Sequence, residues 1–193
     1  MSEQGDQPVA LAARAGLPSE FLYLRDAFPR ERWSMGGLHP TARRWLHMHG
    51  GFRSHQAEMG AMVAAWRAQR IDLRALHGSL IPSLQQFLQH LDGHHRVESG
   101  HYFPALRTLE PRIAAGIDLL DRDHDAIHAH IEAMVETGRA MHQGVLAGQA
   151  DAGDRAHRLA EVLDLAGPQL VRHLDDEEEI VIPLIALRGD PLG

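Results

Sequence analysis

Four stretches of this chain carry an apolar or histidine residue at every third or fourth position, and this spacing constrains the fold more than any other feature. They cover residues 45–66, 80–101, 117–134 and 159–184. Such spacing places one apolar stripe along each of four long helices. No stretch shows the alternation of a half-buried strand. The sequence therefore predicts an all-α fold, an up-down-up-down four-helix bundle with an N-terminal arm.

Turn residues separate the four stretches where a bundle needs connections. Glu110-Pro111-Arg112 lies between the second and third helices, and residues 148–153 lie between the third and fourth. The first break falls between residues 69 and 78, and Pro82 suits the first turn of the second helix. We therefore assign residues 41–188 to the bundle.

Residues 1–40 differ from the bundle because Pro18, Pro29 and Pro40 interrupt them and their aromatic residues offer apolar surface outside the four stripes. We expect an arm with one short helix after Ser19, which could cap it. The arm would pack on the bundle or on a second subunit, and the latter would make a homodimer. Residues 189–193 form a short tail.

Composition excludes several classes of function. The 193 residues include no cysteine, which excludes disulfides, thiolate zinc sites and iron–sulfur clusters. A net charge of −7 argues against a nucleic-acid binder. All basic residues are arginine and asparagine is absent, a bias typical of a GC-rich bacterial genome. Histidine, in contrast, occurs fifteen times, and imidazole is the commonest metal ligand.

Nothing in the sequence predicts membrane targeting. Two acidic residues stand near the start, where a signal peptide carries positive charge. No apolar run approaches the roughly 20 residues that span a bilayer. We expect a soluble cytoplasmic protein.

One pattern, H-x3-E-x5-P, occurs twice. It begins at His94 and again at His173, 79 residues later, and the same offset separates His49 from His128. A spacing of four places each histidine and its glutamate on one helix face, here the face of the apolar stripe. A carboxylate in such a stripe is tolerated only if it is paired or bound to a metal.

Because consecutive helices of such a bundle run in opposite directions, positions equally far from a turn lie at the same level along the bundle axis, and these residues do so. Reflection about Pro111 pairs positions 94 with 128 and 98 with 124, and reflection about the point between 150 and 151 pairs 128 with 173 and 124 with 177. His49 joins them if the first turn is centred near Asp72. The predicted metal ligands are His49, His94, Glu98, His124, His128, His173 and Glu177.

The ligand types predict the metal and its stoichiometry. Nitrogen and oxygen ligands without thiolate suit iron, manganese or zinc, and two roughly octahedral ions offer about twelve positions. Five imidazoles fill five, two bridging carboxylates fill four, and a bridging oxide or hydroxide fills two. About one position stays open for a small ligand such as dioxygen.

These residues resemble the hemerythrin family, whose bacterial form is the HHE cation-binding domain. The resemblance covers about residues 41–188 and includes the stretch His49-Gly-Gly-Phe-Arg53 and both H-x3-E pairs with the prolines that follow them. It implies a non-haem centre of two iron ions. In that centre one iron would be held by His49 and His94, the other by His124, His128 and His173, with Glu98 and Glu177 bridging.

Three assignments remain open at this stage. On the first helix a second stripe passes through His55, which competes with His49. Oxygen-carrying members of the family separate the last histidine and acid by five residues, which would select Glu178 instead of Glu177. His101 continues the inward stripe of the second helix, although we expect it to be a neighbour and not a ligand.

The sequence favours a metal- and oxygen-binding protein over an enzyme. The first hypothesis is reversible binding, sensing or storage of dioxygen. The alternatives are a di-iron oxidoreductase acting on peroxide or nitric oxide, and an iron-storing or iron-responsive module. A ferritin-like site is excluded because it needs two E-x-x-H pairs and the chain has one.

Overall fold

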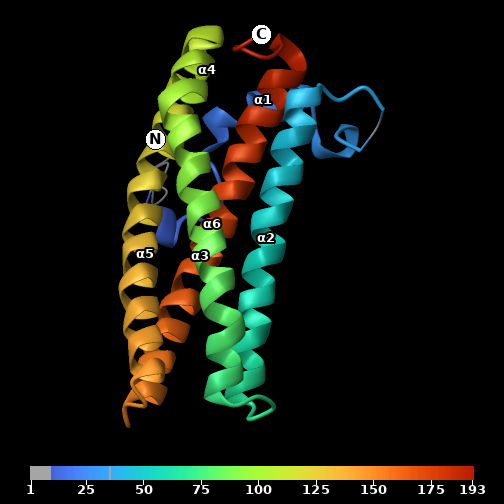
Figure 1. The fold of residues 1–193 in the computed structure, drawn as a ribbon. Coiled ribbons are helices and arrows are strands. Elements are labelled where there is room, and N and C mark those ends of the chain that lie inside the picture. The colour runs from blue at the N-terminus through green and yellow to red at the C-terminus, as the bar shows by residue number, and fades with distance from the viewer. Residues whose placement is uncertain (1–9, 35) are drawn as a thin grey trace, which may run out of the picture. The chain divides into compact units, whose positions relative to one another are not determined.

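The computed structural model describes residues 10–34 and 36–193, and every regular element within them is a helix (Figure 1). Residues 1–9 and 35 of the predicted arm lie outside the described residues. Four long helices pack together, which confirms the all-α fold and agrees with a four-helix bundle. They are α2 (Pro40–Arg67), α3 (Leu73–Val97), α5 (Ala114–Leu146) and α6 (Ala152–Arg188).

Shorter helices precede and connect the long ones. Where the sequence predicts one short helix after Ser19, the structure has the short α-helix α1, with one 3₁₀ turn before it and one after it. No helix among the described residues is long and apolar enough to cross a membrane. The short elements are η1 (Leu11–Ala13), η2 (Ser19–Phe21), α1 (Tyr23–Ala27), η3 (Arg30–Arg32), the π-helical turn η4 (Glu98–Tyr102), α4 (Phe103–Leu109) and η5 (Pro111–Ile113).

The chain divides into two compact units, and each long helix contributes residues to both. Unit 1 contains the chain up to His49 together with Arg96–Ala126 and Gln169–Gly193. Unit 2 contains Gly50–His95 and Ile127–Pro168. The units are described one at a time below.

In unit 2, the connection between α2 and α3 explains where α3 begins. Gln69 has a positive φ of 56°, which ends the helical path after α2. The Asp72 carboxylate then accepts a hydrogen bond of 2.8 Å from the backbone N–H of Ala75 and caps α3. Because this cap starts the helix at Leu73, Pro82 lies inside α3 and not in its first turn, so that prediction was wrong.

In unit 1, a π-helical turn follows α3 directly. The backbone N–H of Phe103 donates to the carbonyl of Glu98, five residues earlier. Pro104 has no N–H to donate to the carbonyl of Gly100, four residues earlier, and this carbonyl lies within the wider turn. Glu98, a predicted metal ligand, is the first residue of this wide turn.

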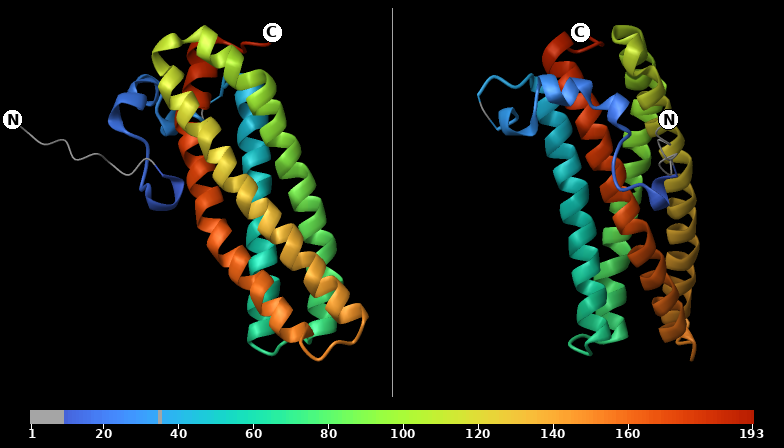
Figure 2. Two further views of the ribbon diagram at one scale, coloured as in Figure 1. Left: turned by 90° about the vertical axis from the view of Figure 1, so that its left-hand side faces the viewer. Right: turned by 180° about the vertical axis from the view of Figure 1, so that it is seen from behind.

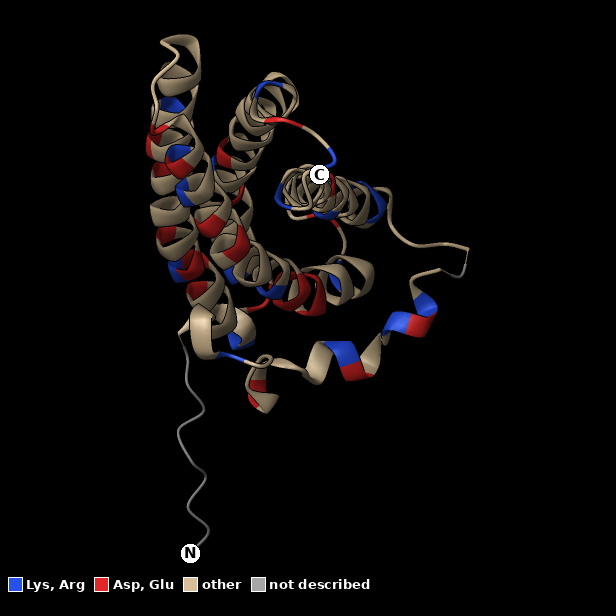
Figure 3. Cartoon of the chain, turned by 90° about the horizontal axis from the view of Figure 1, so that it is seen from below, with Lys and Arg blue, Asp and Glu red and all other residues tan. Residues whose placement is uncertain are grey.

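The core of unit 1 joins the N-terminal segment to the helices. Leu24 of α1 is buried in one cluster with Trp45, Phe103, Leu106 and Ile180. The segment runs along the part of α6 that belongs to the same unit (Figure 2). Its short helices carry both arginine and acidic residues (Figure 3). The described part of the predicted arm therefore packs on its own chain.

Leu106 tests how much this core stabilises the fold. Its side chain is fully buried, so Leu106→Ala should lower the free energy of unfolding by about 2–5 kcal/mol. Leu146, which is 69% exposed, is the matched control, and Leu146→Ala should change the free energy by at most about 0.5 kcal/mol. Urea unfolding of the metal-free variants measures both. Equal losses would show that the core assignment is wrong.

Candidate metal centre

Seven buried side chains among the described residues form two groups that could hold metal ions. All are histidine or glutamate, the ligand types that the sequence predicts. The first group is His49, His94, Glu98 and Glu177, and the second is His95, His124 and His173.

The long helices position these side chains by their spacing. His173 and Glu177 lie one turn apart on α6, so they share a face. His94 and His95 are neighbours near the end of α3, and His94 lies one turn before Glu98 on the same helical path. The buried stripe of α3 is wide enough to include both histidines, since Phe87 and Leu88, about two helical turns earlier, are both buried as well.

Within unit 1, three imidazoles turn the same nitrogen toward the two carboxylates. The Nε2 atom of His49 lies 3.7 Å from Oε1 of Glu177, and that of His173 lies 3.3 Å from Oε2 of Glu177. The Nε2 atom of His124 lies 3.5 Å from Oε2 of Glu98. Glu177 therefore directs one oxygen toward a histidine of each group.

The other ring nitrogen, Nδ1, faces outward in all three imidazoles and meets an oxygen atom. An Nδ1–H that donates there leaves the Nε2 lone pair free for a metal ion. The Ser99 hydroxyl fixes this choice for His124, because it donates to Asp121 at 2.7 Å and must therefore accept from Nδ1. The outer contacts are His49 to Glu178 at 3.1 Å, His173 to Asp123 at 3.4 Å and His124 to Ser99 at 2.9 Å.

Trp45 holds the central carboxylate in place. Its indole N–H donates a hydrogen bond of 2.6 Å to Oε1 of Glu177, and both side chains are buried. A charge-assisted bond of this length fixes the orientation of the carboxylate. Glu177 therefore meets its neighbours in one defined rotamer.

The electrostatics of the site follow from burial and close charges. Burial, together with the nearby charge of Glu177, raises the pKa of Glu98 well above its usual range. Burial beside His173 lowers the pKa of His124 to about 4. Burial alone would lower the pKa of His173, but hydrogen bonds with Asp123 and Glu177 outweigh it and raise the pKa to about 9. At neutral pH a metal ion would therefore meet a neutral His124 and would displace a proton from His173.

The structure brings together six of the seven side chains that the sequence predicts as ligands. The seventh, His128, lies outside both groups, with 57% of its side chain exposed and Glu132 3.5 Å from its Nε2. His95 completes the second group instead. The inward face of α5 passes through His124, Ile127 and Ile131, which are all buried, and His128 is rotated about 100° away from Ile127.

The structure also shows where the residues of the three open assignments lie. Glu177 belongs to a metal-type group, whereas Glu178 contacts the outer nitrogen of His49. His55 hydrogen-bonds to Ser83 at 2.8 Å and lies in neither group. His101 is exposed. A sequence signal for His95 existed, since positions 84, 88, 91, 95 and 98 also form a helical stripe.

One comparison with known proteins gave a match. The family model for the hemerythrin HHE cation binding domain matches residues 40–185. The chain belongs to this hemerythrin family. Comparisons with curated proteins and with solved structures gave no match. The matched range includes all seven grouped side chains, so the HHE domain contains the complete candidate site, and residues 10–34 lie outside the match.

Separate replacement of His95 and His128 tests which of the two histidines binds the metal. His95→Ala should abolish or strongly weaken metal binding, because it removes a buried imidazole of the second group. His128→Ala should leave binding unchanged, because His128 is exposed and outside both groups. Metal content after purification, measured by elemental analysis, reports the result. Loss of metal in His128→Ala and not in His95→Ala would restore the original prediction.

The shifted pKa of His173 predicts how pH affects the protein. The folded pKa of about 9 lies above the roughly 6.5 of an unfolded histidine. Its contribution to the stability of the metal-free protein is therefore complete below about pH 6.5 and is lost as pH rises to about 9. Metal binding becomes easier over the same range, because fewer protons compete for the ring.

Melting curves followed by circular dichroism measure this effect. From pH 6.5 to 9 the metal-free protein should melt at progressively lower temperature, and the increase in melting temperature caused by metal should grow. Asp123→Asn removes the negative charge that faces Nδ1 of His173 and should shift both changes to lower pH. A metal-free protein with its greatest stability at pH 9 would contradict the assignment.

Proposed function

We propose that this HHE domain holds two iron ions and binds dioxygen, or a similar small ligand such as peroxide or nitric oxide, at a position the protein leaves open. One observation carries the proposal: the two oxygens of Glu177 face different histidines, with Oε1 near His49 and Oε2 near His173. This is the arrangement of a carboxylate that bridges two ions. Glu98, near His124, would form the second bridge.

The donor set fits iron. Five imidazoles and two carboxylates, with no thiolate, form the two groups. Imidazole and carboxylate suit redox-active iron, and the protein supplies fewer atoms than two octahedral ions need. His49 and His94 would hold one ion and His95, His124 and His173 the other. Bound iron would supply a redox-active centre with an exchangeable coordination position.

The chain's own residues prepare the site for a small ligand. Apolar side chains exclude water, since the buried ring of Phe103 stacks on His124 with centroids 5.3 Å apart. Trp45 and the outer oxygens hold the carboxylates and imidazoles in fixed orientations. His173 holds a proton between Asp123 and Glu177 until metal displaces it. Such a site favours a small, uncharged ligand over a large substrate.

Iron content and oxygen exposure test this function. The purified protein should contain two iron ions per chain, and the anaerobically reduced form should give a stable, reversible spectral change with dioxygen. His128→Gln serves as the control and should behave like the wild type, because His128 is exposed.

Other outcomes would contradict the proposal in different ways. Rapid, irreversible oxidation followed by turnover of peroxide or nitric oxide would indicate an oxidoreductase. Iron loading well beyond two ions per chain would indicate storage. One zinc ion per chain with no redox response would exclude iron chemistry altogether.

A further inference from the structure

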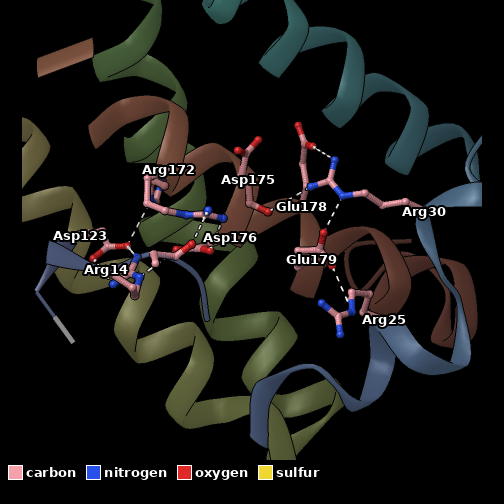
Figure 4. A network of polar contacts seen from close by, with 11 residues as sticks. Arg14, Arg25, Arg30, Asp123, Arg172, Asp175, Asp176, Glu178 and Glu179 are labelled. Carbon is pink, nitrogen blue, oxygen red and sulfur yellow. Dashed lines mark hydrogen bonds and ion pairs between the residues drawn. The ribbon is translucent and has the colours of Figure 1, made fainter. Parts of the chain in front are cut away.

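Two histidines of the candidate metal centre connect, through one carboxylate each, to arginines of the N-terminal segment. This segment, residues 10–34, lies outside the matched family range. The two connections run from Arg14 through Asp123 to His173, and from Arg30 through Glu178 to His49. All the residues involved belong to unit 1, and Figure 4 shows both arginines with their acidic partners.

The Arg14 connection is buried along its whole length. The Arg14 guanidinium, whose side chain is only 1% exposed, donates from Nη1 to Oδ1 of Asp123 at 3.1 Å and from Nη2 to Oδ2. This two-point contact fixes the plane of the Asp123 carboxylate. Oδ2 of the same carboxylate faces Nδ1 of His173 at 3.4 Å.

Asp176 holds Arg14 from the other side. The Arg14 Nε donates to Oδ2 of Asp176 at 2.8 Å, and Arg172 donates to the other oxygen of Asp176 at 2.5 Å. Arg172 also donates to the backbone carbonyl of Ala15 at 3.1 Å. Side chain and backbone of the N-terminal segment are therefore both fastened to α6 beside His173.

The Arg30 connection is more exposed. The Arg30 Nη1 lies 3.4 Å from Oε2 of Glu178, whose other oxygen lies 3.1 Å from Nδ1 of His49. Arg30 also donates from Nε to Oε1 of Glu179 at 2.5 Å. The arginine thus approaches Glu178 on the side away from His49.

Carboxylates in these positions affect metal binding through the imidazole. An acceptor on Nδ1 fixes the ring and raises the basicity of Nε2, and loss of such a partner typically costs about 10–100-fold in metal affinity. An arginine that fixes the carboxylate controls how well it performs this task. Without it, the carboxylate can rotate away from the ring.

We propose that the N-terminal segment acts as a strap in which Arg14 and Arg30 are positioning residues that tune the metal affinity of the HHE domain from outside it. The proposal rests on the proposed metal centre. It deepens that function by assigning control of metal binding to a part of the chain that contributes no ligand.

Two neutral substitutions, Arg14→Gln and Arg30→Gln, test the strap, with cobalt(II) as the metal. Affinity is measured by competition with a chelator, the visible spectrum of bound cobalt reports the coordination, and melting of the metal-free variants reports structure. Arg14→Gln should weaken binding about tenfold and alter the spectrum, and Arg30→Gln should change both in the same direction by a smaller factor.

Arg25→Gln is the matched control. Arg25 belongs to the same segment and contacts acidic residues, Asp26 and Glu179, that are not hydrogen-bonded to the site histidines. It should bind cobalt like the wild type. The effect of Arg14→Gln should also disappear in an Asp123→Asn background, because Arg14 acts through Asp123.

The outcomes separate this proposal from the proposed function. A wild-type protein that binds neither iron nor cobalt overturns both. Wild-type binding with unchanged affinity and spectrum in Arg14→Gln and Arg30→Gln overturns the strap alone, even if the metal-free variants melt earlier. If Arg14→Gln does not fold, Arg30→Gln decides the question, since Arg30 is 43% exposed and its replacement leaves the core intact.

Discussion

The burial of two carboxylates in an apolar interior is the constraint on which the rest of this structure depends. Glu98 and Glu177 are both fully buried. An ionised carboxylate in such surroundings costs several kcal/mol unless cations or hydrogen-bond donors compensate it. Here the compensation comes from the imidazoles and the Trp45 indole, and in the proposed function it also comes from two metal ions. The two carboxylates therefore determine which polar side chains the surrounding helices must place next to them.

The groups that compensate these carboxylates lie around them in successive shells, first imidazoles, then oxygen atoms, then arginines. The imidazoles face the carboxylates with Nε2 and a second set of oxygens with Nδ1. Two of these outer carboxylates, Asp123 and Glu178, meet arginines in turn. Ion pairs of this kind add little net stability, because desolvation offsets the attraction in the buried Arg14–Asp123 pair and solvent screens the partly exposed Arg30–Glu178 pair. Their effect is to hold each group in one orientation, which is what a metal centre needs from its surroundings.

Periodicity predicted the helices because each buries one continuous stripe, and it predicted six grouped side chains because their spacing follows the same repeat. The structure leaves His128 outside both groups, because reflection about the turns predicts the height of a residue along the bundle but not its rotation about the helix axis. His95, on the other half of the wide α3 stripe, lay at the right height and rotation. Arg14 could not be predicted at all. Its role depends on tertiary contacts with Asp123 and Asp176, which no local pattern in the arm reveals.

The two copies of the repeated pattern adopt different backbones, and this difference explains the position of His101. In α6, the helix continues as an α-helix from His173 past Glu177 to Pro183. After α3, the π-helical turn adds one residue, so the buried positions run from Glu98 to Phe103, five residues on, and not to His101. The extra residue turns His101 outward, and it brings the Phe103 ring onto His124. The wide turn thus places an apolar wall where a stripe of constant period would place a sixth imidazole.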